Sequence, residues 1–299
     1  MKEIYMKARA KINLNLEVLG KREDNYHNIE SIFQKVNLYD EIYIKKIEKD
    51  CFELKTNIEE LNNEENIVYK AYMKLKEIYK NITGVSVTIN KKIPMQAGMA
   101  GGSTDCAKFI LGMNKLFDLK LSKREMEDIG KSLGADVVPC FYNKAIKVEG
   151  IGDIITKINT NFKYYILIIK PKISCDTKKM YKQLDEKKSI IQFKNTNKII
   201  NALKGNNVRL LANNLYNVFE EAIQEKEEIR YLKENLMKNG ALGSAMTGSG
   251  SCVYGIFENK EIAQKAFKTL NNNHEIYICT SYNSKKEEMF WYTEGQLLQ

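Results

Sequence analysis

Residues 94–105 read PMQAGMAGGSTD, a turn with three glycines. The apolar residues of the next segment, 106–117, have the spacing of one helix face, so the turn runs directly into a helix N-terminus. Glycines let successive backbone N–H groups converge on one point, and a helix N-terminus adds about half a positive charge. The stretch therefore predicts a phosphate cradle. The hydroxyls of Ser103 and Thr104 are available to a phosphate oxygen, to Mg²⁺ or to the helix as a cap.

A tight structural turn with a Ser or Thr cap explains the same residues, and glycine content alone does not choose between the two interpretations. Two common phosphate-binding motifs are absent from this stretch. It does not end in the Gly-Lys-Ser/Thr of the P-loop, and it lacks the GxGxxG spacing of a dinucleotide-binding turn.

Nearer the N-terminus, residues 10–18 alternate strictly, with apolar residues at even positions and polar residues at odd positions. A period of two predicts a strand with one face on the core and one face open. Lys11 and Asn13 share the open face, about 6.6 Å apart by strand rise. From the alternation alone, Lys11 is more simply explained as a solvated lysine.

Helix and strand patterns alternate along the rest of the chain, which argues for an α/β or α+β architecture. In the first half we expect short strands at 41–47, 51–54 and 85–89, and helices over 67–78, 106–117 and 122–133. A second series of elements begins near residue 160. We expect a strand at 164–169, a mainly helical stretch over 176–238, a strand at 252–257, a helix around 262–270 and a strand at 276–280. These patterns predict two domains, 1–160 and 161–299.

Composition narrows the class of protein. The chain has 299 residues, 47 Lys and Arg against 38 Asp and Glu, and a net charge of +9, which permits anionic partners without selecting one. The longest apolar run, 164–169, is far shorter than the ~20 residues of a membrane span, and no secretion signal opens the chain. We therefore expect a cytoplasmic protein with no membrane partner. Its six cysteines are expected to be reduced, and with two histidines a zinc site or a Ser-His-Asp triad is not expected.

Three segments in order along the chain carry a family resemblance: AKINL at 10–14, PMQAGMAGGSTD at 94–105 and MTGSGSCV at 246–253. Together they resemble the motifs of the GHMP kinases, the galacto-, homoserine, mevalonate and phosphomevalonate kinases and their relatives. The resemblance implies a two-domain α/β (α+β) GHMP-kinase fold with a ferredoxin-like α+β C-terminal domain. It also implies ATP with Mg²⁺ and an active site in the cleft between the domains.

Two further segments, KREDNYH at 21–27 and LGADV at 133–137, resemble one branch of this family, which phosphorylates a cytidine-diphosphate-linked polyol. The partners implied are this small molecule and ATP, without nucleic acid, for a monomer or weak homodimer. Another GHMP kinase with a smaller substrate is the alternative. A basic nucleic-acid-binding protein is the alternative of a different class, but the tyrosines fall in ordinary strand and helix patterns.

The resemblance also implies roles for individual residues. Asp136 is the expected general base, and Lys11 is expected beside it to support the ionised carboxylate and the charge developing on the nucleophile. ATP is expected at Pro94, Gly98, Met99, Ala100, Gly101, Gly102, Ser103, Thr104 and, more loosely, Asn66. Substrate is expected at Asn13, Tyr26, His27, Tyr181, Gly248, Ser249 and Gly250, and Ser103 or Thr104 is the expected Mg²⁺ ligand.

Two residues depart from the family's usual pattern. Asn25 replaces a glycine before Tyr26, and because Asn tolerates positive φ better than most residues we expect the turn to survive. Val138 stands between the Gly-Ala-Asp-Val segment and Pro139, which we interpret as a local substitution that leaves Asp136 in place.

Overall fold

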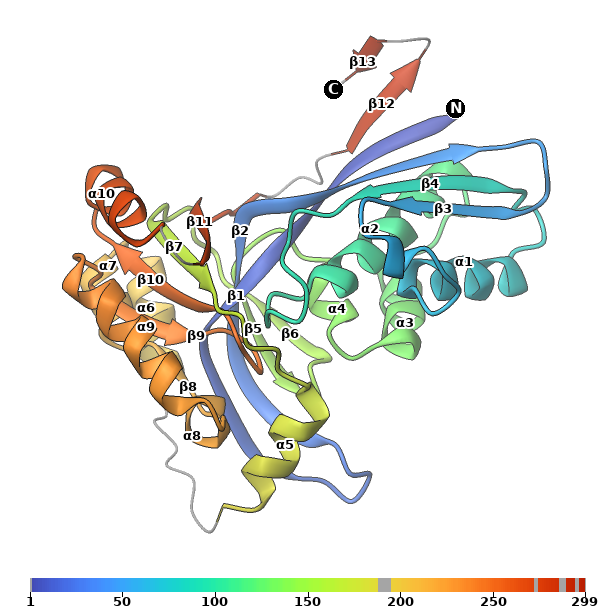
Figure 1. The fold of residues 1–299 in the computed structure, drawn as a ribbon. Helices are drawn as coiled ribbons and strands as arrows, with labels where there is room; N and C mark the ends of the chain where they lie inside the picture. Colours follow the sequence, from blue (N-terminus) through green and yellow to red (C-terminus); the bar gives the residue numbers. More distant parts are fainter. Residues whose placement is uncertain (1, 188–194, 272–273, 285–288, 294–295, 299) are drawn as a thin grey trace.

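The computed structural model describes residues 2–187, 195–271, 274–284, 289–293 and 296–298. Among these residues, nine strands form one sheet and four form another, and helices pack on both (Figure 1). No helix of the described residues is long and apolar enough to cross a membrane. All six cysteines are free thiols.

The larger sheet is organised around two long antiparallel strands, β1 (Glu3–Lys21) and β2 (His27–Lys46), which run through the molecule (Figure 1). Its main path is β13-β12-β1-β2-β4-β3. The parallel pair β3 (Phe52–Thr56) and β4 (Val85–Asn90) is connected through the short helix η1 (Glu59–Leu61) and α1 (Ile67–Ile78). The strands β5 (Ile146–Gly150) and β6 (Ile154–Lys157) extend the sheet from β2.

Helices α1 and α2 (Gly101–Leu116) pack against this sheet, α3 (Lys123–Leu133) and α4 (Val137–Cys140) pack against α2, and all four contribute to one apolar core. The apolar spacing of α2 explains its position, because Cys106, Ile110 and Met113 are fully buried. Ser122 and Glu125 form the capping box that starts α3, and Gly134 ends it. The helices expected in the first half of the chain are therefore confirmed.

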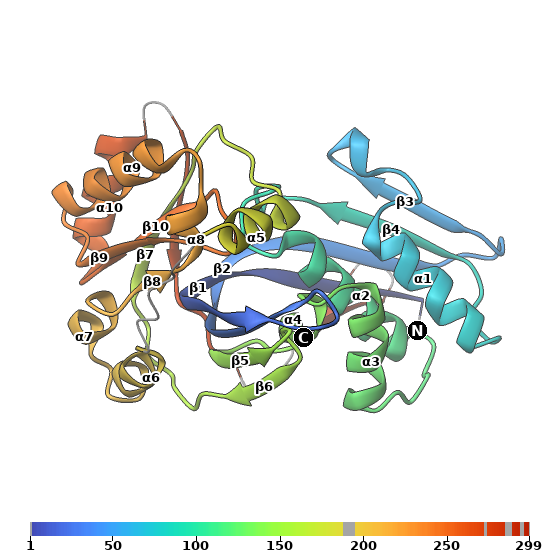
Figure 2. The ribbon, with the colours of Figure 1, turned by 90° about the horizontal axis from the view of Figure 1, so that it is seen from below.

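The smaller sheet has four antiparallel strands in the order β11-β7-β10-β9. Its strands are β7 (Tyr165–Lys170), β9 (Gly243–Met246), β10 (Val253–Phe257) and β11 (Glu275–Thr280). Numbered within this sheet, the order is 4-1-3-2, the ferredoxin-like arrangement expected for this half. Helices α9 (Lys226–Lys238) and α10 (Lys260–Leu270) cover one face, while α6 (Thr196–Lys204) and α7 (Val208–Ala212) lie on the other side (Figure 2).

Segments from the second half of the chain also join the larger sheet. The short strand β8 (Tyr216–Asn217) pairs with β1 in parallel, and β12 (Met289–Thr293) pairs with the start of β1 and with β13 (Gln296–Leu298). One apolar cluster contains Ile12 and Leu14 of β1 together with Ile166 of β7 and Tyr254 of β10. The two halves of the chain thus share a core.

Several expectations need correction. The polar face of β1 is not open, because Lys11, Asn13, Asn15 and Glu17 are all buried, and Asn13 and Asn15 hydrogen-bond to residues from the second half of the chain. Residues 41–47 do not form a separate strand; β2 continues to Lys46 without a break. The sequence patterns missed β5, β6, β8, β9, β12 and β13. The helical prediction for 176–238 is met by α5 (Thr177–Asp185), α6, α7, α8 (Phe219–Ala222) and α9, while residues 188–194 lie outside the described part of the chain.

Candidate active site

A cavity of about 1010 Å³ lies where the glycine-rich turn, β1, the β1–β2 hairpin and α5 meet. It brings together residues from all five sequence segments singled out above, which are spread from position 11 to position 250. The expected site residues that line it are Lys11, Asn13, Tyr26, His27, Asn66, Pro94, Gly98, Met99, Ala100, Gly101, Gly102, Ser103, Asp136, Tyr181, Gly248, Ser249 and Gly250.

Thr104 is the expected site residue that does not line this cavity. Its side chain is fully buried, and its hydroxyl donates to the Arg9 carbonyl and accepts from Lys35 Nζ. The cap prediction for Ser103 or Thr104 is wrong. Helix α2 begins with Ala100 as N-cap, in the left-handed conformation at φ +57°, and no side chain caps it. Of the two residues, only Ser103 lines the cavity.

The glycine-rich turn touches the third motif directly. A Cβ on Gly98 would lie 2.0 Å from the Thr247 carbonyl oxygen, and a Cβ on Gly248 would lie 2.7 Å from the Gly98 carbonyl oxygen. Both glycines also have positive φ, which disfavours any other residue. Glycine is thus required at these positions because two backbone loops from distant parts of the chain pass within contact of each other.

Asn13 joins the first motif to the third. Its Oδ1 accepts hydrogen bonds from Lys11 Nζ at 2.6 Å and from the Gly248 N–H at 2.9 Å, and Thr247 Oγ1 lies 3.2 Å away. Its Nδ2 donates to Ser31 Oγ, and its backbone carbonyl accepts from Tyr254 O–H. The side chain is therefore committed to positioning Lys11 and the glycine loop.

Lys11 is buried, with its ammonium 4.6 Å from the centre of the Phe33 ring. Burial lowers the pKa of this lysine to about 8, although the Asp136 carboxylate acts in the opposite direction. Asp136 itself is exposed at the cavity, at the N-cap position of α4, and its side chain does not cap that helix. The carboxylate is thus free to accept a proton from a ligand, with the positive charge of Lys11 nearby.

The hairpin between β1 and β2 supplies Tyr26 and His27. Asn25 adopts φ +65°, so the turn survives the replacement of glycine as expected. Tyr26 is 56% exposed and lines the cavity. His27 is buried, its ring is stacked on Tyr181 of α5 with centroids 4.7 Å apart, and its Nε2 lies 2.7 Å from Asp185 Oδ1.

Sequence reasoning missed several residues of the site. Lys21, Lys178, Lys182 and Asp185 line its outer part, and the three lysines supply positive charge. Beneath the glycine-rich turn, the Lys91 ammonium is bonded to Asp40 and Asp105. Burial alone would lower the pKa of Lys91, but the two carboxylates raise it and keep the lysine charged. The KREDNYH segment includes Lys21 but does not show its role, because the partners of Lys21, Lys91 and Asp185 lie between 14 and 164 positions away in the chain.

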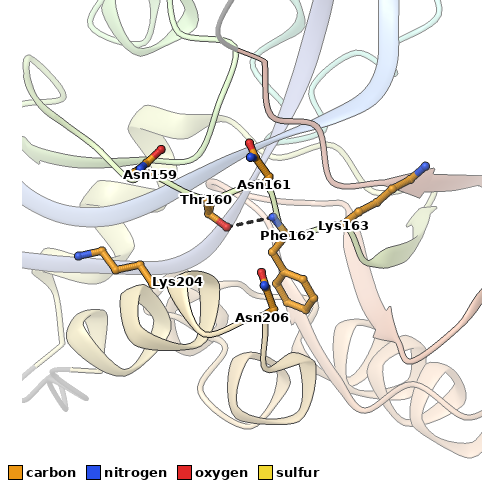
Figure 3. Close-up of a pocket in the computed structure, with 7 residues that line it drawn as sticks. All are labelled: Asn159, Thr160, Asn161, Phe162, Lys163, Lys204 and Asn206. Atoms are coloured by element: carbon orange, nitrogen blue, oxygen red, sulfur yellow. Dashed lines mark hydrogen bonds between the residues drawn. The ribbon is translucent and has the colours of Figure 1, made fainter.

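A second cavity of about 530 Å³ is lined by the segment 159–163 and by Lys204 and Asn206 (Figure 3). Thr160 Oγ1 accepts a hydrogen bond from the Phe162 N–H within it. None of the expected site residues lines this cavity, so it is separate from the candidate active site.

Comparison with known families gives two matches in this chain. The model described as the GHMP kinases N terminal domain matches residues 66–144, and the model described as GHMP kinases C terminal matches residues 199–276. The two segments correspond to the glycine-rich turn with its helices and to most of the second half.

Curated relatives cover nearly the whole chain. A 4-diphosphocytidyl-2-C-methyl-D-erythritol kinase of Clostridioides difficile is 40% identical, over 93% of this chain and 95% of the relative. The protein of the same name from Caldicellulosiruptor saccharolyticus is 43% identical, over 88% of this chain and 91% of its own length.

Solved structures show the same fold. A crystal structure of 4-(cytidine 5'-diphospho)-2C-methyl-D-erythritol kinase matches with a TM-score of 0.81 at 22% identity, covering 94% of this chain and all of the other. A homoserine kinase from Cytophaga hutchinsonii matches with a TM-score of 0.74 at 20% identity, covering 95% of this chain and 96% of the other.

Proposed function

The chain belongs to the GHMP kinase family, and from that premise we propose that it transfers the γ-phosphoryl group of ATP to the 2-hydroxyl of 4-diphosphocytidyl-2-C-methyl-D-erythritol. This step belongs to the non-mevalonate route to isoprenoid precursors. The observation that carries the proposal is the single cavity lined at once by the glycine-rich turn, Lys11, Asp136 and the Tyr26–His27 pair.

Phosphoryl transfer demands mainly positioning and the neutralisation of charge. We propose that the triphosphate of ATP lies along the glycine-rich turn, at the N-terminus of α2, where backbone N–H groups and the helix dipole favour anions. Ser103 faces this region. The adenosine lies toward the start of α1, where Asn66 caps the helix through Oδ1 and donates from Nδ2 to the Leu61 carbonyl. Both groups of its amide are thus engaged by the protein.

At the reacting hydroxyl, Asp136 is the proposed general base. Lys11 is the proposed electrostatic partner, since a charged ammonium favours the ionised carboxylate and the developing alkoxide. Asn13 holds the Lys11 ammonium at 2.6 Å and so fixes its direction. The cavity that both Lys11 and Asp136 line supports these roles.

The cytidine half of the substrate is proposed to lie between the β1–β2 hairpin and α5. Tyr26 and Tyr181 offer aromatic faces for a pyrimidine, and His27 offers a hydrogen-bonding edge. Lys21, Lys178 and Lys182 line the same part of the cavity and suit the diphosphate. Gly248, Ser249 and Gly250 form the wall next to the polyol.

We further propose that Mg²⁺ accompanies ATP. No group of three or more His, Cys, Asp or Glu side chains suited to a metal occurs in the part of the chain that the structure describes. Mg²⁺ commonly uses few protein ligands beside phosphate oxygens, which fits the Ser103 hydroxyl as a ligand, with Asp136 in the same cavity. When bound, the ion would neutralise phosphate charge. A cytoplasmic location and a monomer or weak homodimer complete the proposal.

The decisive experiment is ADP formation by the purified protein with ATP, Mg²⁺ and the cytidine-diphosphate-linked polyol. We expect turnover that depends on both substrates and is absent with mevalonate or homoserine as acceptor. A folded protein that forms no ADP above background with the cytidine compound contradicts the proposal. Turnover with one of the smaller acceptors instead would identify a different kinase of the same family.

A further inference from the structure

Asp185, at the end of α5, fixes the hydrogen bonding of His27. Its Oδ1 lies 2.7 Å from His27 Nε2, and its Oδ2 lies 3.1 Å from Lys21 Nζ. The His27 side chain is 7% exposed, so this contact is largely protected from water. The ring nitrogen that faces the protein therefore has a specific partner, and that partner comes from the second half of the chain.

The chemistry of this contact determines which nitrogen carries the proton. Partial burial works to raise the pKa of Asp185, but the contacts with His27 and Lys21 outweigh it and lower the pKa, so the group is an ionised carboxylate near neutral pH. A carboxylate only accepts hydrogen bonds, so Nε2 must donate. In the neutral imidazole, Nδ1 then has a free lone pair and acts as an acceptor.

The same helix also fixes the orientation of the ring. Tyr181 precedes Asp185 by one helical turn, and its ring lies on the His27 ring with an interplanar angle of 22°. Tyr181 is itself held edge-on by Phe219. Because Tyr181 covers one face of the imidazole and Asp185 engages Nε2, the ring is held in one orientation and meets a ligand in the cavity through its remaining edge.

We propose that Asp185 is a specificity-determining residue that selects cytosine over uracil by holding the proton of His27 on Nε2. The acceptor Nδ1 pairs with the exocyclic amino group of cytosine, which is a donor. Uracil presents a carbonyl oxygen at the same position, and two acceptors repel each other. This inference rests on the proposed function, because it assumes that the cavity takes a cytidine diphosphate group. It adds the residue that sets the preference for the base.

The protonation pattern can be observed without any turnover. The chain has two histidines, so ¹⁵N spectra of the imidazoles in the full-length protein, compared with those of His274→Gln, assign His27 unambiguously. We expect the neutral imidazole of the wild type to carry its proton on Nε2 and to leave Nδ1 unprotonated. In Asp185→Asn, whose amide can donate as well as accept, we expect a mixture of the two tautomers. A wild-type His27 protonated on Nδ1 would overturn the inference.

The base preference can be measured as binding. With a non-hydrolysable ATP analogue saturating the nucleotide site, cytidine diphosphate is expected to bind at least tenfold more tightly than uridine diphosphate. Asp185→Asn is expected to reduce this ratio by about tenfold. The matched control is Lys21→Met, which removes the other partner of Asp185 and keeps the carboxylate. It is expected to weaken both diphosphates and to leave their ratio unchanged.

The outcomes separate this inference from the proposed function. Equal binding of the two diphosphates, or an unchanged ratio in Asp185→Asn, refutes the role of Asp185 even if the enzyme phosphorylates its cytidine substrate. A tenfold preference that Asp185→Asn abolishes supports that role even if no phosphoryl transfer to the cytidine-linked polyol is found. In that case the proposed acceptor, and not the preference for the base, is wrong.

Discussion

At the scale of single residues, Lys11 shows how burial sets the pKa of a group in the site. The strand places it beside Asn13 and close to the Phe33 ring, and its burial there removes water from its ammonium. The cost of that desolvation appears as a pKa lowered to about 8. A lysine with this pKa is charged at neutral pH and loses its charge in a range that experiments can reach.

The first prediction concerns the pH dependence of turnover. Since Lys11 acts in its charged form, kcat/KM, which reports the groups of the free enzyme, should be highest below pH 8 and should fall as the pH rises through about 8. Arginine stays charged over this range, so Lys11→Arg should have a lower kcat but no such decline. Steady-state rates between pH 6 and 10 test this. If the decline persists in Lys11→Arg, another group causes it.

The second prediction concerns Asp136. Asp136→Asn keeps the shape of the side chain and removes its ability to take a proton, so kcat should fall by about 10² to 10⁴. Asp153→Asn is the matched control, because Asp153 pairs with Lys131 and does not line the cavity. It should retain nearly the wild-type kcat. A near-wild-type rate for Asp136→Asn would remove Asp136 from the role of general base.

At the scale of elements, the two glycine loops form a single unit. The backbone contact between Gly98 and Gly248 leaves no space for a Cβ on either residue. Helix α2 starts at this contact, so any shift of the loops also shifts the N–H groups that face the cavity. The element proposed to bind phosphate is therefore a pair of loops that come from positions 150 residues apart.

The third prediction follows from this contact. Gly98→Ala and Gly248→Ala should each lower the free energy of unfolding by about 2 kcal/mol or more, because a Cβ clashes with backbone and φ is positive. Gly102→Ala is the control, since its Cβ would meet only Ile67 Cγ2 at 3.8 Å. It should change stability by about 1 kcal/mol or less. Urea denaturation of the three variants tests this, and equal losses would show that the clash is not the cause.

The sequence predicts where the helices and strands lie better than it predicts which of their faces are buried. The spacing of apolar residues and the Ser122 cap located the helices, and all but one of the site residues predicted from the motif resemblance line the cavity. The alternation in β1 was interpreted as a half-open strand because a local pattern cannot show what covers the polar face. Lys21, Lys91 and Asp185 were missed for a related reason, since each acts through a partner that only the folded chain brings near.

At the scale of the whole molecule, the division at residue 160 stays a prediction, but the structure shows extensive contact across it. The cluster around Ile12 and Leu14 is completed by Ile166 and Tyr254, and β8 adds to the sheet of the first half. Asn13 receives hydrogen bonds from Gly248 and Tyr254. The first half by itself would expose a large apolar surface.

The fourth prediction tests this dependence. A fragment of residues 1–160 should lack a cooperative urea transition, while the full chain should unfold cooperatively, because the fragment leaves the apolar residues of β1 without their packing partners. Tryptophan is not available in the fragment, since Trp291 is the one tryptophan of the chain, so circular dichroism is the suitable measurement. A sharp transition in the fragment would show that it folds alone.

The hydrogen bonds that Asn13 accepts from Gly248 and Tyr254 have a consequence for synthesis on the ribosome. A nascent chain of 200 residues already contains the glycine-rich turn, Lys11 and Asp136, yet Asn13 still lacks two of its partners, Gly248 and Tyr254. A chain that ends before residue 248 should therefore have no kinase activity, rather than a reduced one. Asn13, which holds the Lys11 ammonium, gains these two bonds only after residue 254 has been synthesised.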